Sequence, residues 1–62
     1  MIEVGKNYKV LHHDKYWFDL QVHSVDDEFV RGAIIKSEKW VIGSVVTVRL
    51  SFCNFRASLP VV

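Results

Sequence analysis

The chain has 62 residues and a formal net charge of +1, with 50% hydrophobic and 24% charged residues. This composition is too apolar for a disordered chain, and the near-neutral charge gives no bulk electrostatic reason for a nucleic-acid or membrane partner. We interpret residues 1–62 as one domain, which at this length buries only about 60% of the surface that its unfolded chain exposes. Such a domain needs a dense core, or a second subunit that completes it.

The single cysteine, Cys53, excludes an internal disulfide and favours a reducing, cytoplasmic setting. Residues 1–6 contain no cationic region followed by an apolar run, so they do not resemble a signal peptide. The apolar runs are far shorter than the roughly 20 residues that a membrane-spanning helix needs. We therefore expect no membrane partner.

The first elements in chain order are extended. Residues 2–4 predict a short initial strand or a cover for the core, and residues 5–7 predict a turn. Alternating side chains over residues 8–12 predict the first full strand. The polar residues 13–15 then predict a connection in the form of a tight hairpin.

The clearest strand signal lies at residues 17–25, where side chains of two kinds alternate. One face carries Phe18, Leu20 and Val22, and the other carries Trp17, Asp19, Gln21 and His23. Because successive side chains of a strand point to opposite faces, the first set predicts a core and the second an exposed surface. The acidic residues 26–28 end this strand.

Residues 29–36 predict a strongly bent strand, because β-forming residues surround Gly32. A glycine inside a strand often marks a bulge or a close approach of two backbones, and a bulge can bend a strand around a small barrel. Residues 37–39 predict a turn, and residues 40–42 predict either a short strand or a packed loop.

The C-terminal third of the chain predicts two more strands. Residues 45–52 alternate cleanly, whereas residues 53–56 interrupt the alternation and predict a single helical turn. Residues 57–62 predict a last strand, which Pro60 would confine to an edge because proline has no N–H for a ladder. Short strands about ten residues apart, with turns between them, are typical of a small barrel or sandwich.

Two stretches carry a resemblance to a known fold. Residues 5–10 and 14–18 combine a glycine, an alternating strand, a polar turn and an aromatic pair, and residues 45–62 follow the order strand, helical turn, strand. This order resembles SH3-like and Tudor-type small barrels and covers most of the chain. The resemblance implies an all-β fold: a small five- to six-stranded antiparallel SH3-like barrel with a single helical turn before the last strand. The acidic, proline-binding loop of true SH3 domains is absent, so we draw no function from it.

Catalytic and metal-binding patterns are weak in this chain. The only candidate metal ligands are His12, His13, Asp14, His23 and Cys53. They lack the paired spacing that is typical of zinc sites. A Cys–His catalytic pair would need an orienting group, an oxyanion hole and a cleft, and a domain of this size seldom has room for them. We therefore expect no enzyme, no metal and no cofactor.

The aromatic residues are the better indication of function. Three of them are predicted to belong to the core: Tyr8, Phe18 and Phe52. In contrast, Trp17 lies on a polar strand face, Tyr16 lies in the turn before it, and Trp40 lies in a segment with polar flanks. These three could form one exposed cluster that suits a peptide or stacked bases. The alternative is that Trp40 closes the end of the barrel and Trp17 covers a loop.

Two functional hypotheses follow from these patterns. The first is a non-enzymatic protein-interaction module, or small regulatory adaptor, that binds another protein or itself; its surplus of outward apolar residues predicts a homo-oligomer. The alternative is an RNA- or single-stranded nucleic-acid-binding barrel, since residues 39–62 carry three basic side chains and no acidic one. The candidate binding residues are Tyr16, Trp17, Asp19, His23, Trp40 and Arg49.

Overall fold

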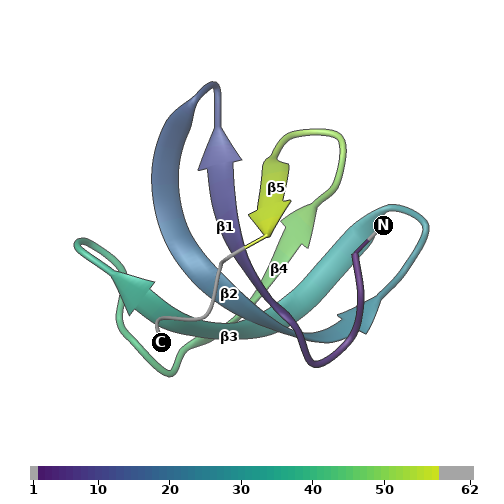
Figure 1. Cartoon of the computed structure of the whole chain (residues 1–62), viewed down its shortest axis with the longest axis horizontal. Helices are drawn as coiled ribbons and strands as arrows, with labels where there is room; N and C mark the ends of the chain where they lie inside the picture. Colours follow the sequence, from purple (N-terminus) through teal and green to yellow (C-terminus); the bar gives the residue numbers. More distant parts are fainter. Residues whose placement is uncertain (1, 58–62) are drawn as a thin grey trace.

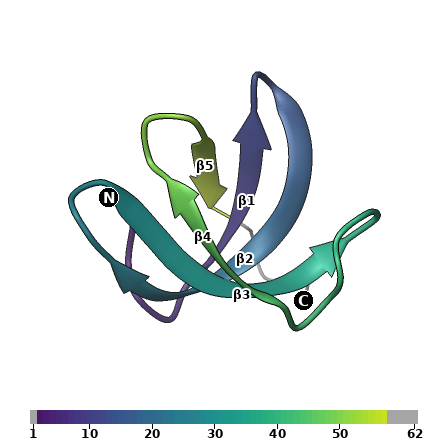
Figure 2. The same ribbon diagram turned by 180° about the vertical axis from the view of Figure 1, so that it is seen from behind.

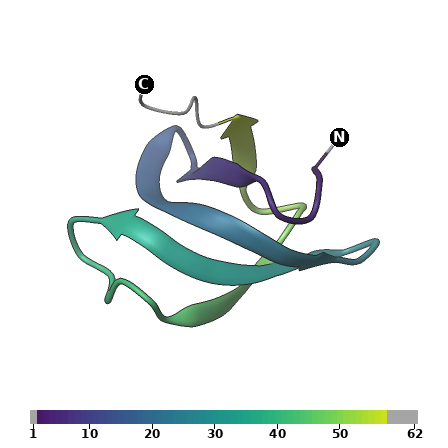
Figure 3. The same cartoon turned by 60° about the horizontal axis from the view of Figure 1, so that its bottom comes forward.

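A computed structural model describes residues 2–57, and the regular structure in this range is β-strand throughout (Figure 1). The strands are β1 (Asn7–His12), β2 (Lys15–Val25), β3 (Phe29–Ser37), β4 (Val45–Arg49) and β5 (Asn54–Ala57). They form one sheet in the order β4-β3-β2-β1-β5, in which every neighbouring pair is antiparallel (Figure 3). The predicted all-β, antiparallel class is therefore confirmed.

The sheet curves strongly along its two longest strands, β2 and β3 (Figures 1 and 2). The pairing of strands is irregular at three places, and each irregularity leaves one residue without an opposite partner. These unmatched residues are Trp17 in the β1–β2 ladder, and His23 and Ile35 in the β2–β3 ladder. An extra residue of this kind bends a strand and increases its twist, so the bulges account for the curvature.

Gly32 lies on β3 opposite Val22, beside the bulge at His23. A methyl group at Gly32 would overlap the carbonyl oxygen of Gln21 and would lie 3.1 Å from the Leu20 side chain. Only a residue without a side chain allows β2 and β3 to approach so closely. The predicted bent strand, with a close backbone approach at Gly32, is confirmed.

The buried residues of the core come from β1, β2, β3, β4 and the connection between β4 and β5. They are Val10, Phe18, Leu20, Val22, Val30, Ile34, Val48 and Cys53. Of the aromatic residues predicted for the core, Phe18 is buried and Tyr8 packs at the periphery of the core. Phe52 is 62% exposed, so its assignment to the core is wrong. The alternation stops at Arg49, where a turn closed by the Phe52 N–H and the Arg49 carbonyl ends β4.

The connection between β1 and β2 is a two-residue turn. Its residues, His13 and Asp14, have φ values of 51° and 62°. Two successive positive φ values are typical of the turns that match the twist of a β-hairpin. The predicted tight hairpin is therefore confirmed.

The C-terminal third differs from the sequence-based expectation. A helical turn was expected at residues 53–56, but Asn54–Ala57 is extended and pairs with β1, with Phe55 opposite Val10. The free edge of β1 supplies the hydrogen-bonding groups for this pairing, which no local pattern of the sequence reveals. The predicted strand over residues 57–62 lies, apart from Ala57, outside the described residues.

The loop between β3 and β4 contains no strand at residues 40–42, and two of these three side chains are mostly exposed. Val41 is 74% exposed and Ile42 is 61% exposed. Gly43, with a φ of 93°, turns the chain toward β4. Within residues 2–57 the edge strands β4 and β5 are not paired with each other, so the sheet is not closed.

Candidate functional site

Three aromatic rings stand in succession near the hairpin end of β2. The rings of His12 and Trp17 are 4.8 Å apart, and those of Trp17 and Trp40 are 5.8 Å apart. The ring of Trp40 also meets buried Phe18 nearly edge-on, with centroids 5.5 Å apart and an interplanar angle of 82°. These spacings are typical of favourable aromatic pairs. We call His12, Trp17 and Trp40 the aromatic row.

The two tryptophans combine packing with exposure. Trp40 touches the core through Phe18 and is still 44% exposed. Trp17 is half-buried and packs against the core from the position of the bulge in β2. Each tryptophan therefore packs against the core with part of its ring and leaves another part exposed.

A single hydroxyl connects the backbone segments that carry the two tryptophans. Oγ of Ser37 accepts hydrogen bonds from the N–H groups of Lys39, at 3.2 Å, and Trp40, at 2.8 Å. The same hydroxyl donates to the carbonyl oxygen of Trp17 at 3.4 Å. Ser37 therefore positions the loop of Trp40 relative to β2.

Tyr16 and Asp19 form a hydrogen-bonded pair beside the aromatic row. The Tyr16 hydroxyl donates to Oδ1 of Asp19 at 2.7 Å. Burial first, and then this hydrogen bond to the carboxylate, raise the pKa of Tyr16 to about 12. Asp19 is only 6% exposed, although alternation places it on the exposed face. Phe18, Asp19 and Leu20 are consecutive in the regular part of the β1–β2 ladder, so Asp19 keeps the face opposite Phe18 and Leu20. Its carboxylate is buried there under the Tyr16 side chain that bonds to it.

A hollow of about 450 Å³ opens between the start of β2 and the β3–β4 loop. We call it the tryptophan pocket, and its lining residues are Lys15, Tyr16, Trp17, Glu38, Lys39 and Trp40. The aromatic side chains supply apolar surface, and the charged ones bring both signs of charge. This combination of apolar surface with a few polar groups is typical of binding pockets.

A second hollow, of about 400 Å³, is also lined by Trp17. We call it the arginine pocket, and its lining residues are His12, Trp17, Phe29, Thr47, Val48, Arg49, Phe52 and Cys53. The guanidinium carbon of Arg49 lies 5.5 Å from the ring centre of Phe29 and 5.4 Å from that of Phe52. Arg49 is thus held by cation–π contacts with two rings.

The structure brings some of the predicted site residues together and separates others. Tyr16, Trp17 and Trp40 line the tryptophan pocket, and Arg49 lines the adjoining one. Asp19 belongs to the same region, as the buried acceptor for the Tyr16 hydroxyl. His23 is exposed at the other bulge of β2, about 20 Å along the strand from Trp17. It is therefore separate from this site.

Sequence reasoning missed several residues of the site. Ser37 has a recognisable signal, because a serine two or three residues before a backbone N–H commonly accepts its hydrogen bond at a turn. As a histidine, His12 is a candidate metal ligand or catalytic base by sequence, but its ring lies beside Trp17. The rings that hold Arg49 come from separate segments, β3 and the β4–β5 connection, so no local pattern predicts them.

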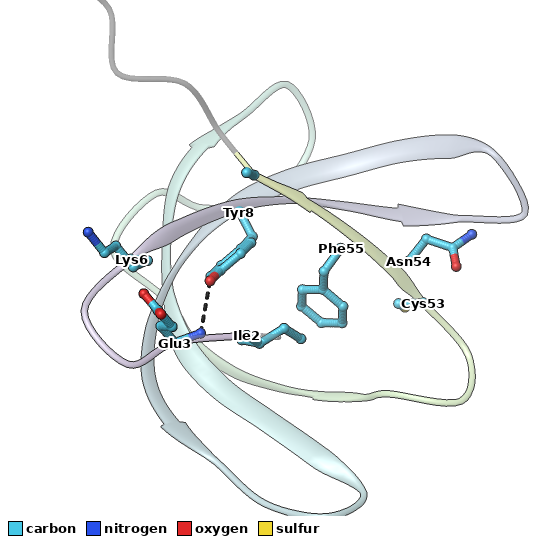
Figure 4. A pocket seen from close by; sticks show the side chains of 8 residues that line it. Ile2, Glu3, Lys6, Tyr8, Cys53, Asn54 and Phe55 are labelled. Carbon is cyan, nitrogen blue, oxygen red and sulfur yellow. Dashed lines mark hydrogen bonds between the residues drawn. The ribbon is translucent and has the colours of Figure 1, made fainter.

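A further hollow, of about 640 Å³, lies between the N-terminal segment and β5 (Figure 4). Ile2, Tyr8 and Phe55 surround it, and all three also pack against the core. The Tyr8 hydroxyl there accepts a 2.8 Å hydrogen bond from the Glu3 N–H (Figure 4). This hollow is therefore the end of the core, and its side chains show no concentration of one charge.

Cys53 and His12 both line the arginine pocket, as a thiol nucleophile and its general base would. Burial raises the pKa of the Cys53 thiol, so the thiol keeps its proton at neutral pH. A reactive cysteine needs the opposite environment, which lowers the thiol pKa. Within residues 2–57, no three side chains of His, Cys, Asp or Glu are grouped as metal ligands would be.

Comparisons with protein-family models, with curated proteins and with solved structures found no match to this chain. Residues 2–57 contain no helix with the length and apolar character to cross a membrane. The chemistry of the aromatic row and its two pockets is therefore the basis for a functional proposal.

Proposed function

We propose that this chain is a non-enzymatic protein-interaction module that binds its partner through the tryptophan pocket. The observation that carries the proposal is the 44% exposure of Trp40, whose ring rests on Trp17 and Phe18. A large aromatic side chain held in one orientation loses little conformational freedom on binding, and tryptophan is enriched among the residues that dominate binding energy.

We also propose that the curved sheet is an open form of an SH3-like barrel. The support for this is the strand order, in which β1 pairs with both β2 and β5, together with three bulges that bend the long strands. In this arrangement β4 and β5 stand as the two edges of the opening.

The charges around the tryptophan pocket favour a protein partner over a nucleic acid. Lys15 and Lys39 lie at this pocket together with Glu38, so the pocket has one net positive charge, too few for the successive phosphates of a nucleic acid. The net charge of +1 is also far from the strongly basic character of most nucleic-acid-binding domains. Binding of a nucleic acid is therefore the alternative that the experiments below measure.

The proposal can be tested by displaying random peptides to the immobilised protein and sequencing those that are enriched. We expect enrichment with the wild type and with Val41→Ala, and its loss with Trp40→Ala. Val41 is a suitable control because it lies beside Trp40 in the same loop and is 74% exposed. Circular dichroism checks that each variant is folded.

Two further measurements separate the proposed partner from the alternatives. Light scattering reports whether the protein binds itself, and self-association that Trp40→Ala abolishes would also support an interaction module. Binding of a fluorescent 12-nucleotide uridine RNA at low salt would be weakened steeply by added salt. If the RNA binds and no peptide or second copy does, the proposal is wrong.

A further inference from the structure

The side chain of Arg49 is held in place without a carboxylate partner among residues 2–57. The rings of Phe29 and Phe52 contact its guanidinium, and no ion pair involves it in this part of the chain. Asp27 and Glu28 line a third hollow together with Arg49, beside the β2–β3 connection, but neither forms an ion pair with it. An arginine that stacks through its plane can still donate hydrogen bonds from its N–H edge.

The two pockets of the site are contiguous because Trp17 lines both of them. A ligand that lies in the tryptophan pocket and crosses Trp17 therefore reaches the arginine pocket. An extended chain suits this arrangement better than a compact small molecule does, since the two hollows share only Trp17 among their lining residues.

The charges along this course favour an acidic ligand. The side chains that line the two pockets include three cations, Lys15, Lys39 and Arg49, and one carboxylate, Glu38. Carboxylates accept two parallel hydrogen bonds from a guanidinium, which adds direction to the attraction. Glu38 is a lining residue of the tryptophan pocket only. The lining residues of the arginine pocket include Arg49 and no acidic side chain.

We infer that the module binds an extended acidic peptide segment, with an apolar side chain in the tryptophan pocket and an Asp or Glu carboxylate on Arg49. This inference rests on the proposed function and specifies its ligand. Peptide binding would then have two separable parts: an apolar anchor that depends on Trp40 and an acidic contact that depends on Arg49.

Peptide display with matched variants tests this inference. We expect the wild type to enrich peptides in which an Asp or Glu stands at a fixed distance from a large apolar residue. Arg49→Gln should enrich peptides with the apolar residue but without the acidic one. For a selected peptide, replacing its carboxylate by the amide should weaken binding to the wild type about tenfold, and should leave binding to Arg49→Gln unchanged.

Phe52→Ala provides a second test that keeps the arginine. Because Phe52 is 62% exposed, its removal should leave the fold intact while one of the two rings that hold Arg49 is lost. We expect this variant to bind the acidic peptide more weakly than the wild type and to bind the amide peptide equally well.

The failures of the two proposals are distinguishable. Trp40-dependent enrichment without any acidic preference would overturn this inference and leave the interaction module standing. If the wild type enriches no peptide, the inference is wrong; the interaction module is then wrong as well, unless the protein associates with itself through Trp40. Arg49-dependent binding of the uridine RNA, without binding of acidic peptides, would also overturn the inference.

Discussion

The backbone N–H of Trp40 donates a 2.8 Å hydrogen bond to Oγ of Ser37. Through its own bond to the carbonyl oxygen of Trp17, this hydroxyl also holds the strand on which the neighbouring indole is mounted. Ser37 thus links the backbone segments that carry the two indole rings, whose centres are 5.8 Å apart. The shape of the tryptophan pocket is accordingly sensitive to one serine.

Ser37→Ala should lower the free energy of unfolding by about 1 kcal/mol, because two N–H groups lose their acceptor. Urea denaturation followed by tryptophan fluorescence measures this change. Ser24→Ala, at an exposed serine of β2, is the matched control and should remain within about 0.5 kcal/mol of the wild type. Equal stability of the two variants would contradict the anchoring role of Ser37.

The phenol of Tyr16 should lose its proton only near pH 12, because burial and the bond to Asp19 raise its pKa from 10.0. The folded state then holds this proton more tightly than the unfolded chain does. The contribution of Tyr16 to stability is therefore complete below about pH 10 and is lost as the pH rises through 12. The difference in phenolate absorbance between wild type and Tyr16→Phe measures the midpoint, and a midpoint near 10 would contradict both the burial of the phenol and its hydrogen bond to Asp19.

Gly32→Ala should destabilise the protein by about 2 kcal/mol or more, since the new methyl group would overlap the Gln21 carbonyl oxygen. The neighbouring variant Arg31→Ala, at an exposed position of the same strand, should change stability by less than about 0.5 kcal/mol. Thermal unfolding followed by circular dichroism compares the two. A Gly32→Ala variant with wild-type stability would mean that β2 and β3 are farther apart than described.

The hairpin between β1 and β2 offers a stabilising change. His13 and Asp14 both have positive φ values, which glycine and asparagine adopt more readily. The double variant His13→Asn with Asp14→Gly should therefore raise the free energy of unfolding by about 1 kcal/mol. The analogous change of Asp26→Asn with Asp27→Gly, where neither φ is positive, should give no gain. The same urea titration serves for both, and equal gains would refute this explanation.

Strands β1 to β4 could be predicted because each has a signal in its own sequence. The alternation of Phe18, Leu20 and Val22 identifies three core residues, since a strand has a period of two wherever its ladder is regular. The polar turn after β1 and the glycine of β3 are likewise local signals.

The remaining features depend on contacts between distant segments. The bulge at Trp17 arises from the pairing of β1 with β2, so the alternation of β2 alone does not reveal it. Residues 54–57 are extended because β1 offers them an edge, although their own pattern suggests a helical turn. For the site, the aromatic residues were predicted individually, but the convergence of Phe29 and Phe52 on Arg49 required the folded chain.

Trp17 is the unmatched residue of the β1–β2 ladder and also lines both pockets, so the curvature of the sheet and the binding surface share one position. A deletion there would change the shape of the domain and the ligand contact together. Trp40 is different, because it lies in a loop that belongs to no ladder. A laboratory selection for new ligands should therefore randomise residues 38–42 and keep the length of β2 constant, so that specificity can vary while the scaffold is retained.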